Sequence, residues 1–477
     1  MGGEVAAVEG KQAWGWGLAG LILILLHGVL LGISHEFVYG RPILERPTGL
    51  MVVLLVVCGL IYLGALFIVK PPSRPNWRWW VWMGAVGLTM RLLMFPSSPM
   101  LEDDAYRYLW DGALVAHGHN PYTHAPSEAQ RGDVPEGIAQ LATASGIVVD
   151  RVNHPELRTI YPPVAQAGFA IAHLAAPWRF EGLRLVWLAF DAVSLALVVA
   201  LLGALGLPKA MAAAYWWNPL LVKEAYNSGH MELIIVPFVI GGLLLAVRGR
   251  WALSGGALAL GLGAKVWPVL LLPIVARQQT LRWPQWALLA FAFAVPAAIV
   301  SAPVLLSGFD GASGFRAYAE RWRMNDSLHQ LIYWASAAVV PENARAVSRS
   351  VSGLLVLVCV ALLCRKPALD GRAMCERGLW AVAALFLLSP TQFPWYYLWL
   401  LPLLTIRFSP GLLVLTATLP LYYLRFPMAE RGYEAWFFNG VVWLQFGPSL
   451  VLLAWEAWRE WGARPRPNEG GGADHAA

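Results

Sequence analysis

The feature of this sequence that most constrains its fold is a succession of long apolar segments. The first runs from residue 14 to 33, and a helix of about 20 residues is long enough to cross a hydrocarbon core of about 30 Å. Further candidate spans are 50–69, 79–94, 183–205, 210–223, 233–247, 286–306, 351–364, 379–388, 395–406, 411–424 and 436–455. The sequence therefore predicts an all-α fold, a polytopic transmembrane helical bundle with about 11–14 spans.

Positive charges in short loops predict the orientation of this bundle, because such loops lie mainly on the cytoplasmic side. The basic loops are 70–78, 248–250, 277–282, 365–377 and the tail from residue 459. They place both termini in the cytoplasm and the loops after 33, after 95, around 227 and at 308–348 on the outer face. The number of membrane crossings between these loops fits this orientation only if 161–177 is partly inserted and 251–276 dips into the membrane as two short halves.

The overall composition supports a lipid environment and excludes several functional classes. Hydrophobic residues make up 58% of the 477 residues and charged residues only 13%, against about 25% charged in soluble domains. The net charge of +6 is scattered over loops, so no nucleic-acid partner is expected. The four cysteines show no metal-ligand spacing, and we expect no metal and no cofactor. Residues 1–467 are predicted to form one membrane domain, followed by a disordered cytoplasmic tail at 468–477.

The loop at 96–161 is the best candidate for the catalytic part, since connectors of this length commonly carry function. It opens with Glu102, Asp103 and Asp104 directly outside the third span. In a helix, Asp104, Arg107, Tyr108 and Asp111 share one face. Clustered carboxylates raise one another's pKa values, which suits a general base. Alternatively, these acids only cap the helix and complement its dipole.

Several motifs in order along the chain resemble one enzyme family. They are DDAYRYLWDG at 103–112, GHNPY at 118–122, YPP at 161–163, Asn218-Pro219 with Glu224 and 228–230, Ala264-Lys265 with Pro268, and SPTQFPWYYL at 389–398. Together they resemble membrane glycosyltransferases of the GT-C superfamily, particularly polyprenyl-phosphate-mannose-dependent mannosyltransferases. Two departures stand out. Met231 and Glu232 replace an expected Asn-Asp pair, and Asp103 and Asp104 compete for the role of base, with spacing in favour of Asp104.

The resemblance implies a set of site residues. Asp104, with Asp103 beside it, would be the catalytic base. The donor phosphate would be bound by Arg107, Lys265, Arg321 and Arg323. The sugar or the acceptor would be bound by Tyr108, Asp111, Asn120, Tyr122, Tyr161, His230, Glu232, Trp395 and Tyr396.

Other interpretations of these residues remain open. Arg107 could pair with Asp103 or Asp111 on its own helix. His230 could be a purely structural histidine. The aromatic residues near Trp395 could belong to an interfacial belt. Lys265 interrupts an otherwise uncharged run at 257–275, so an anionic partner is its best explanation unless the run breaks there.

The predicted function is an inverting transfer of a sugar, mannose by resemblance, from a polyprenyl-phosphate donor to a glycan or lipid acceptor. It would occur on the outer face of the cell inner (plasma) membrane, with the donor tail lying in the lipid bilayer. The alternative is a multi-span transporter or lipid flippase, which predicts coupling acids near the midplane in corresponding halves of the chain. A structural scaffold would leave the acids at 102–111 unexplained.

Overall fold

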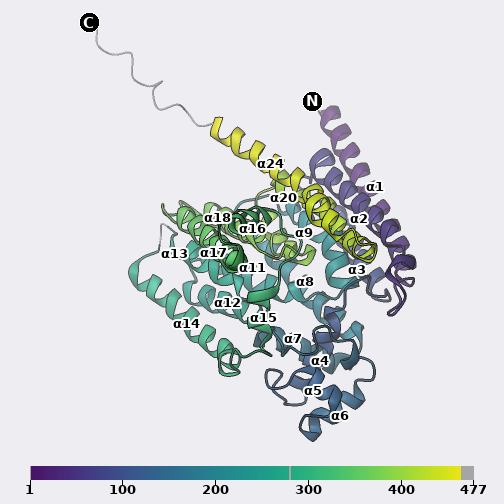
Figure 1. The fold of residues 1–477 in the computed structure, drawn as a ribbon. Helices are drawn as coiled ribbons and strands as arrows, with labels where there is room; N and C mark the ends of the chain where they lie inside the picture. The colour runs from purple at the N-terminus through teal and green to yellow at the C-terminus, as the bar shows by residue number, and fades with distance from the viewer. Residues whose placement is uncertain (1, 279–280, 463–477) are drawn as a thin grey trace.

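The computed structural model describes residues 2–278 and 281–462, and helices account for nearly all regular structure in these ranges. The bundle contains long helices in the order shown in Figure 1. They are α1 (Gly2–Ser34), α2 (Thr48–Gly64) with the π-turn η2 (Ala65–Val69), α3 (Trp77–Met94), α8 (Phe180–Ala204), α14 (Trp283–Leu306), α17 (Ala344–Leu363), α18 (Gly371–Leu388) and α24 (Val442–Gly462). The predicted all-α membrane bundle is confirmed.

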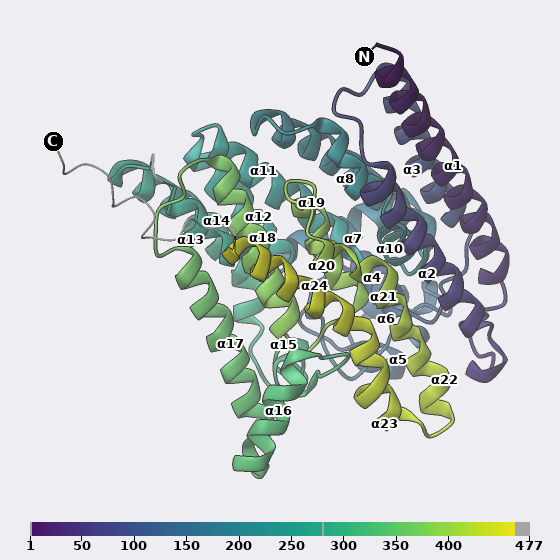
Figure 2. The same cartoon turned by 90° about the horizontal axis from the view of Figure 1, so that it is seen from above.

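Shorter helices complete the chain between these long elements. On the way to α14 lie α9 (Ala213–Trp216), α10 (Pro219–Val222), α11 (Ile235–Val247), α12 (Trp251–Ala264) and α13 (Leu271–Ala276). After α14 come α15 (Gly314–Arg321), α16 (Leu328–Val339), α19 (Leu401–Leu404), α20 (Pro410–Leu413), α21 (Leu415–Thr418), α22 (Arg425–Glu430) and α23 (Glu434–Trp436). Figure 2 shows α17 and α24 running along the outside of this group.

Seven helical stretches of the described chain are long and apolar enough to cross a membrane, or eight if one strongly bent pair counts as a span. This is fewer than the 11–14 spans counted from the sequence. The difference arises because several apolar runs are divided: 210–223 forms a series of short helical turns, and 395–406 begins in the 3₁₀ helix η9 (Pro394–Trp399) before α19. Proline and glycine interrupt such runs without removing their hydropathy.

The chain also changes direction at two places where the sequence predicted a turn or a break, around residue 227 and within 251–276. The stretches Pro219–Asn227 and Met231–Val247 meet at an angle of 104°. Further along, α12 ends at Ala264, Lys265 is extended, and the 3₁₀ helix η7 (Trp267–Leu270) leads into α13. The predicted division of 251–276 into two short halves is therefore observed, with Lys265 at the break.

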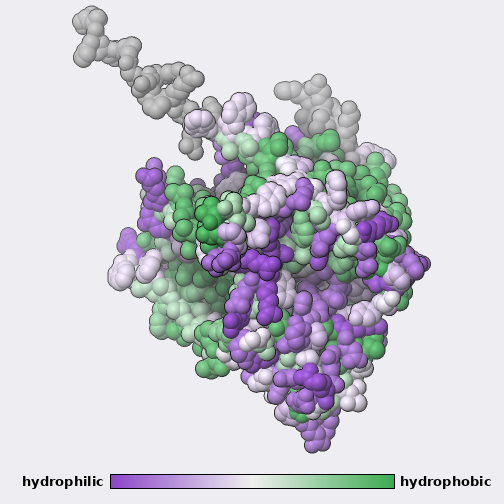
Figure 3. Space-filling model, viewed as in Figure 1, coloured by the Kyte–Doolittle hydropathy of each residue, from purple (hydrophilic) through white to green (hydrophobic). Residues whose placement is uncertain are grey.

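The loop after α3 folds into a small helical layer of its own. It comprises α4 (Asp104–Ala116), α5 (Pro126–Arg131) and α6 (Glu136–Ala144), and α7 (Pro163–Ala175) connects it to the bundle. Gly112 permits α4 to lie directly on α7, since a Cβ there would overlap the carbonyl of Phe169. The α4–α6 layer lies at the end of the molecule opposite the N-terminal end of α1 (Figure 1). Its surface is mainly hydrophilic, whereas apolar surface covers the flanks (Figure 3).

A buried ion pair joins two of the long helices. Arg91 on α3 donates from Nε to Asp191 Oδ2 on α8 at 2.7 Å, and both side chains are fully buried. Tyr215 and Tyr226 donate to the two oxygens of Asp191, each at 2.7 Å. The Arg91 guanidinium also lies over the Trp216 ring. Because three side chains donate hydrogen bonds to the buried Asp191 carboxylate, this cluster serves helix packing.

Candidate active site

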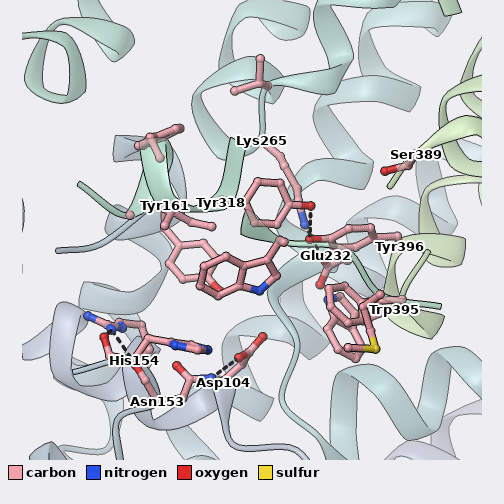
Figure 4. A pocket seen from close by; sticks show the side chains of 18 of the residues that line it. Asp104, Asn153, His154, Tyr161, Glu232, Lys265, Tyr318, Ser389, Trp395 and Tyr396 are labelled. Atoms are coloured by element: carbon pink, nitrogen blue, oxygen red, sulfur yellow. Dashed lines mark hydrogen bonds and ion pairs between the residues drawn. The ribbon is translucent and has the colours of Figure 1, made fainter. Parts of the chain in front are cut away.

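A cavity of about 1050 Å³ opens where the α4–α6 layer meets the bundle. Its wall combines the start of α4, the chain at 153–162, the break after α12, α15 with the chain that follows it, η9, and the start of α22. In Figure 4, Asp104 and Asn153 lie across the cavity from Lys265 and Glu232, with aromatic rings between them. Pockets with an apolar aromatic lining and a few convergent charged groups are typical of ligand sites.

The two aspartates at the start of α4 share one hydrogen-bond donor. Asn153 Nδ2 donates to Asp103 Oδ1 at 3.0 Å and to Asp104 Oδ1 at 2.6 Å. Asp103 occupies the N-cap position of α4 but its side chain makes no capping hydrogen bond. The capping interpretation therefore does not account for the Asp103 carboxylate, and both acids face the cavity.

Burial changes the acidity of this pair. Burial, with a smaller contribution from the charge of Asp104, raises the pKa of Asp103 to about 6. Burial also raises the pKa of Asp104, although the hydrogen bond from Asn153 opposes the change. The Asp104 side chain keeps 24% of its surface exposed. A carboxylate that is accessible and more basic than usual suits proton abstraction near neutral pH.

Arg107 holds the loop that carries Asn153. Its guanidinium donates to the carbonyls of Leu157 at 3.0 Å, Asn153 at 2.8 Å and His154 at 2.9 Å. These bonds to backbone take the place of the ion pair with Asp103 or Asp111 that helical spacing allowed. Because Arg107 and Asp104 lie on the same helix, this clamp fixes the position of Asn153 relative to the two acids. Arg107 also contributes to the cavity wall.

Lys265 faces the cavity from the break after α12 and has an acidic partner. Its Nζ donates to Glu232 Oε1 at 2.6 Å, and the Glu232 side chain is only 1% exposed. The ammonium also lies 4.0 Å from the ring centre of Tyr396 and 4.9 Å from that of Trp399. The run breaks at Lys265, so the sequence pattern alone does not require a bound anion, and the acid that its ammonium contacts within the chain is Glu232. Glu232, which replaces the expected acid of the motif, lies in the cavity.

The other predicted cations reach the cavity from the segment after α14. Arg321 ends α15 and has an exposed side chain. Arg323 donates to Asp326 Oδ2 at 2.8 Å and lies over the ring of Tyr333. Arg425, at the start of α22, was not predicted but also lines the wall. The cavity therefore has basic groups on several sides.

Aromatic residues supply much of the remaining wall. Trp395 and Tyr396 on η9 are buried inside the protein around the cavity, which is unlike the lipid-facing position of an interfacial belt. Tyr318 on α15 bonds to the hydroxyl of Tyr396 at 3.0 Å. Tyr161 packs edge-to-face on Tyr108, whose hydroxyl it approaches at 3.4 Å. Flat rings at these positions can contact the apolar face of a sugar.

Four of the predicted binding residues lie outside the cavity wall. Asp111 is buried and accepts a hydrogen bond from Gln166 at 3.1 Å. Tyr122 donates to the carbonyl of Tyr161 at 2.8 Å, and Asn120 accepts from the backbone of Tyr122 in a local turn. His230 is fully buried behind Trp395, with ring centres 3.9 Å apart. These residues support the wall rather than form it.

Comparison with known families decides the class of this protein. Residues 14–280, more than half of the chain, match the family described as alpha-(1→6)-mannopyranosyltransferase, N-terminal domain. The chain belongs to this family. It is therefore a glycosyltransferase of the mannosyltransferase class, consistent with the predicted GT-C membrane type. Searches of curated proteins and of solved structures found no match.

The cavity of this mannosyltransferase uses residues from both sides of the matched region. Asp104, Glu232 and Lys265 lie within 14–280, whereas Tyr318 and Trp395 lie beyond it. The tertiary structure thus brings the second half of the chain onto the same cavity as the matched region.

Sequence reasoning missed several residues that line the cavity of the mannosyltransferase. They are Glu102, Asn153, Tyr318, Trp322, Tyr422 and Arg425. Asn153 is the most consequential of them, because it bonds to both aspartates from 49 residues along the chain. Its neighbourhood carries no motif, so only the folded loop reveals it. Glu102 adjoined the aspartates in the sequence and could have been included on that ground.

Proposed function

We propose that this enzyme transfers mannose, with inversion, from a polyprenyl-phosphate donor to a hydroxyl group of a glycan or lipid acceptor on the outer face of the membrane. The observation that carries the proposal is the position of Asp104. It is an accessible carboxylate with a raised pKa, at the polar edge of an aromatic cavity in a chain of the mannosyltransferase family. Asp104 acts as the general base, with Asp103 beside it.

The reaction is a single displacement. The acceptor oxygen attacks the anomeric carbon as Asp104 takes its proton, the bond from that carbon to the phosphate oxygen breaks, and the lipid phosphate leaves. A carboxylate in hydrogen-bond reach of the acceptor hydroxyl is the requirement for this role. Asn153 supports it by fixing one oxygen of Asp104 through the 2.6 Å hydrogen bond, which leaves the other oxygen free of that contact.

Cations around the cavity are suited to the negative charge of the leaving phosphate. Arg321 and Lys265 are the principal candidates: Arg321 has an exposed side chain, and Lys265, although it is paired with Glu232, enters the cavity from the break after α12. Arg323 is shared with Asp326 and Arg107 is engaged with backbone carbonyls, so their contribution to phosphate binding is smaller. Arg425 joins the candidates on position. Guanidinium groups can grip phosphate with two hydrogen bonds, and an ammonium group acts as a compact charge.

The sugar is bound among the aromatic rings. Tyr161, Trp395 and Tyr396 present flat surfaces to the cavity, with Tyr108 supporting Tyr161. Glu232 lines the same region, and its Oε2 is a buried acceptor with no hydrogen-bond partner among the described residues, which a sugar hydroxyl can reach only if the surrounding wall opens. Selection of mannose would then depend on how these hydroxyl-binding groups are spaced.

Two features support an outer-face active site in the inner (plasma) membrane. The basic loops 70–78 and 365–377 lie in the sequence where cytoplasmic loops are expected. The hydrophilic α4–α6 layer lies at the opposite end of the molecule from the N-terminal end of α1 (Figures 1 and 3). On this proposal both termini are cytoplasmic, and the donor tail enters the cavity from the bilayer.

The test is Asp104→Asn. The amide keeps the size of the side chain but cannot accept the proton, so turnover should fall about 10²–10⁴-fold while donor binding is kept. Asp103→Asn should lose less. The matched control is Asp133→Asn, because Asp133 is an exposed acid of the same layer that pairs with Arg131; it should leave turnover unchanged. Near-normal turnover in both Asp103→Asn and Asp104→Asn would remove this loop from the chemistry.

A further inference from the structure

His230 occupies an unusual position at the 104° bend between two helical stretches. The bend is tight because Gly229 has φ +79°, and it lies against α4, where a Cβ on Gly229 would come within 3.0 Å of Ala105 Cβ. Trp187 fixes the turn by donating to the Gly229 carbonyl at 3.0 Å. This packing holds the imidazole beside the Asp104 carboxylate and outside the cavity wall.

The two ring nitrogens of His230 face two different carboxylates. Nδ1 lies 3.7 Å from Asp104 Oδ2, and Nε2 lies 3.5 Å from Glu224 Oε2. Within residues 2–278 and 281–462, neither nitrogen has a hydrogen-bond partner. Burying an imidazole without a hydrogen-bond partner costs folding free energy. A functional role between the two acids would explain why the histidine is found there. Distances of this size are common in unliganded sites and shorten in the substrate complex.

Glu224 is held so that one oxygen remains directed at the histidine. Its Oε1 accepts from the Tyr423 hydroxyl at 2.7 Å and lies 3.5 Å from Lys223 Nζ. Its Oε2 has no hydrogen-bond partner within the described chain. Lys223 is itself fixed by Ser228 Oγ at 2.9 Å and by the Tyr423 hydroxyl. The Glu224 carboxylate therefore has a balancing cation on one side and a free acceptor on the side of His230.

From this geometry we propose that Asp104, His230 and Glu224 form a proton relay, in which His230 is a positioning residue that acts through Asp104. The inference rests on the proposed function of Asp104 as general base. A neutral imidazole has one N–H and one lone pair. With the N–H directed at Glu224 Oε2, the lone pair of Nδ1 is directed at Asp104 Oδ2. The same division of roles orients the histidine of a catalytic triad.

In this relay, His230 holds the proton taken up by Asp104 until the product has left. The proton leaves the acceptor hydroxyl, bonds to the Asp104 carboxylate and passes to His230 Nδ1. The imidazolium then lies between the carboxylates of Asp104 and Glu224, while the charge of Lys223 opposes it. No electrons are exchanged, and the proton departs to solvent by the reverse route through Asp104 once the product has left. In the resting state, the neutral ring leaves Asp104 without a competing donor at Oδ2, so that oxygen can receive the incoming proton.

A purely structural histidine is the competing explanation, since the ring also stacks on Trp395 at an interplanar angle of 15°. The variant His230→Phe separates the two. It keeps an aromatic ring of similar size against Trp395 and removes both nitrogens. His27→Phe is the matched control, because His27 is also a buried histidine and lies outside the cavity wall.

The experiment measures turnover and donor KM for His230→Phe, Glu224→Gln and the double variant, with thermal unfolding in detergent to check folding. Turnover should fall about 10–100-fold in each single variant, with donor KM changed by less than about two-fold. The double variant should lose little more than either single variant, because the two residues act as a unit. His27→Phe should keep normal turnover.

Separate results overturn the relay and the proposed function. If His230→Phe folds and keeps turnover within about two-fold while Asp104→Asn is inactive, the relay is wrong and Asp104 remains the base. If turnover and donor KM change in parallel, His230 only shapes the binding wall and the relay is wrong. If His230→Phe fails to fold, Glu224→Gln decides: it keeps the acceptor for Tyr423, and unchanged turnover refutes the relay. Active Asp104→Asn would instead refute the proposed base.

Discussion

Removing the ammonium of Lys265 should affect stability as well as donor use, because its partner is buried. In Lys265→Ala the Glu232 carboxylate, 1% exposed, loses the cation that lies 2.6 Å away. Breaking a buried ion pair from one side costs about 3–5 kcal/mol. The Lys265 side chain is 23% exposed, so water already screens the pair, and Glu232 can bind a proton in the variant. We therefore expect a loss near the lower end, about 3 kcal/mol.

A second substitution separates stability from catalysis. In Lys265→Ala/Glu232→Gln neither charge remains, so most of the lost stability should return. Donor KM should nevertheless rise in both Lys265→Ala and the double variant if the ammonium meets the donor phosphate. A hydrogen bond to a charged group contributes about 1.5–3 kcal/mol, which corresponds to about a 10–100-fold rise in KM. Lys366→Ala, an exposed lysine outside the cavity wall, is the control and should change neither quantity.

The assay combines denaturation of the four purified proteins in one detergent with initial rates over a range of donor concentrations. Two results would contradict the reasoning. If the double variant is as unstable as Lys265→Ala, the loss does not come from an unpaired Glu232. If the double variant has a normal donor KM, Lys265 serves only as the partner of Glu232, and Arg321 becomes the first candidate for the phosphate.

Two further predictions concern pH and orientation. As pH falls through about 6, kcat/KM should fall, because burial raises the pKa of Asp103 to about 6 and also raises that of Asp104, and a protonated carboxyl cannot act as base. In Asp103→Asn, the fall of kcat/KM on the acid side should move to lower pH. If it stays at the same pH, the two acids are not coupled. The orientation can be tested by cysteine labelling in a chain with Cys359 and Cys364 replaced by serine. A cysteine at Gln130 should react with an impermeant thiol reagent added outside intact cells, whereas one at the exposed Leu369 should react only after the cytoplasmic side is opened. The reverse pattern would place the cavity on the cytoplasmic side.

The sequence predicted features that depend on local pattern. Apolar length predicted the bundle, and helical spacing predicted that Asp104, Arg107 and Tyr108 would lie together on α4. The number of spans required by the basic loops predicted that 251–276 divides into two short halves, and the break lies at Lys265, which is extended. The first two of these conclusions require only the residues within about two helical turns.

Features that depend on distant contacts could not be predicted. Asn153 reaches the two aspartates only because Arg107 clamps the loop around it. Glu232 was doubted because it departs from the expected motif, yet the 104° bend brings it to Lys265. Span number was also uncertain from sequence, since a run interrupted by 3₁₀ turns has the same hydropathy as a continuous helix. Such outcomes are set by tertiary packing.

The ion pair between α3 and α8 has a consequence for how the chain is made. Arg91 precedes Asp191 by 100 residues, so α3 leaves the ribosome well before its counter-charge exists. Arg91 lies in the last turn of α3, where its charge costs less on insertion than the about 2.5–3.5 kcal/mol of an arginine at the centre of a span, but α3 is not among the stretches apolar enough to cross unaided. Stable insertion of α3 therefore depends on the later synthesis and insertion of α8, which supplies Asp191.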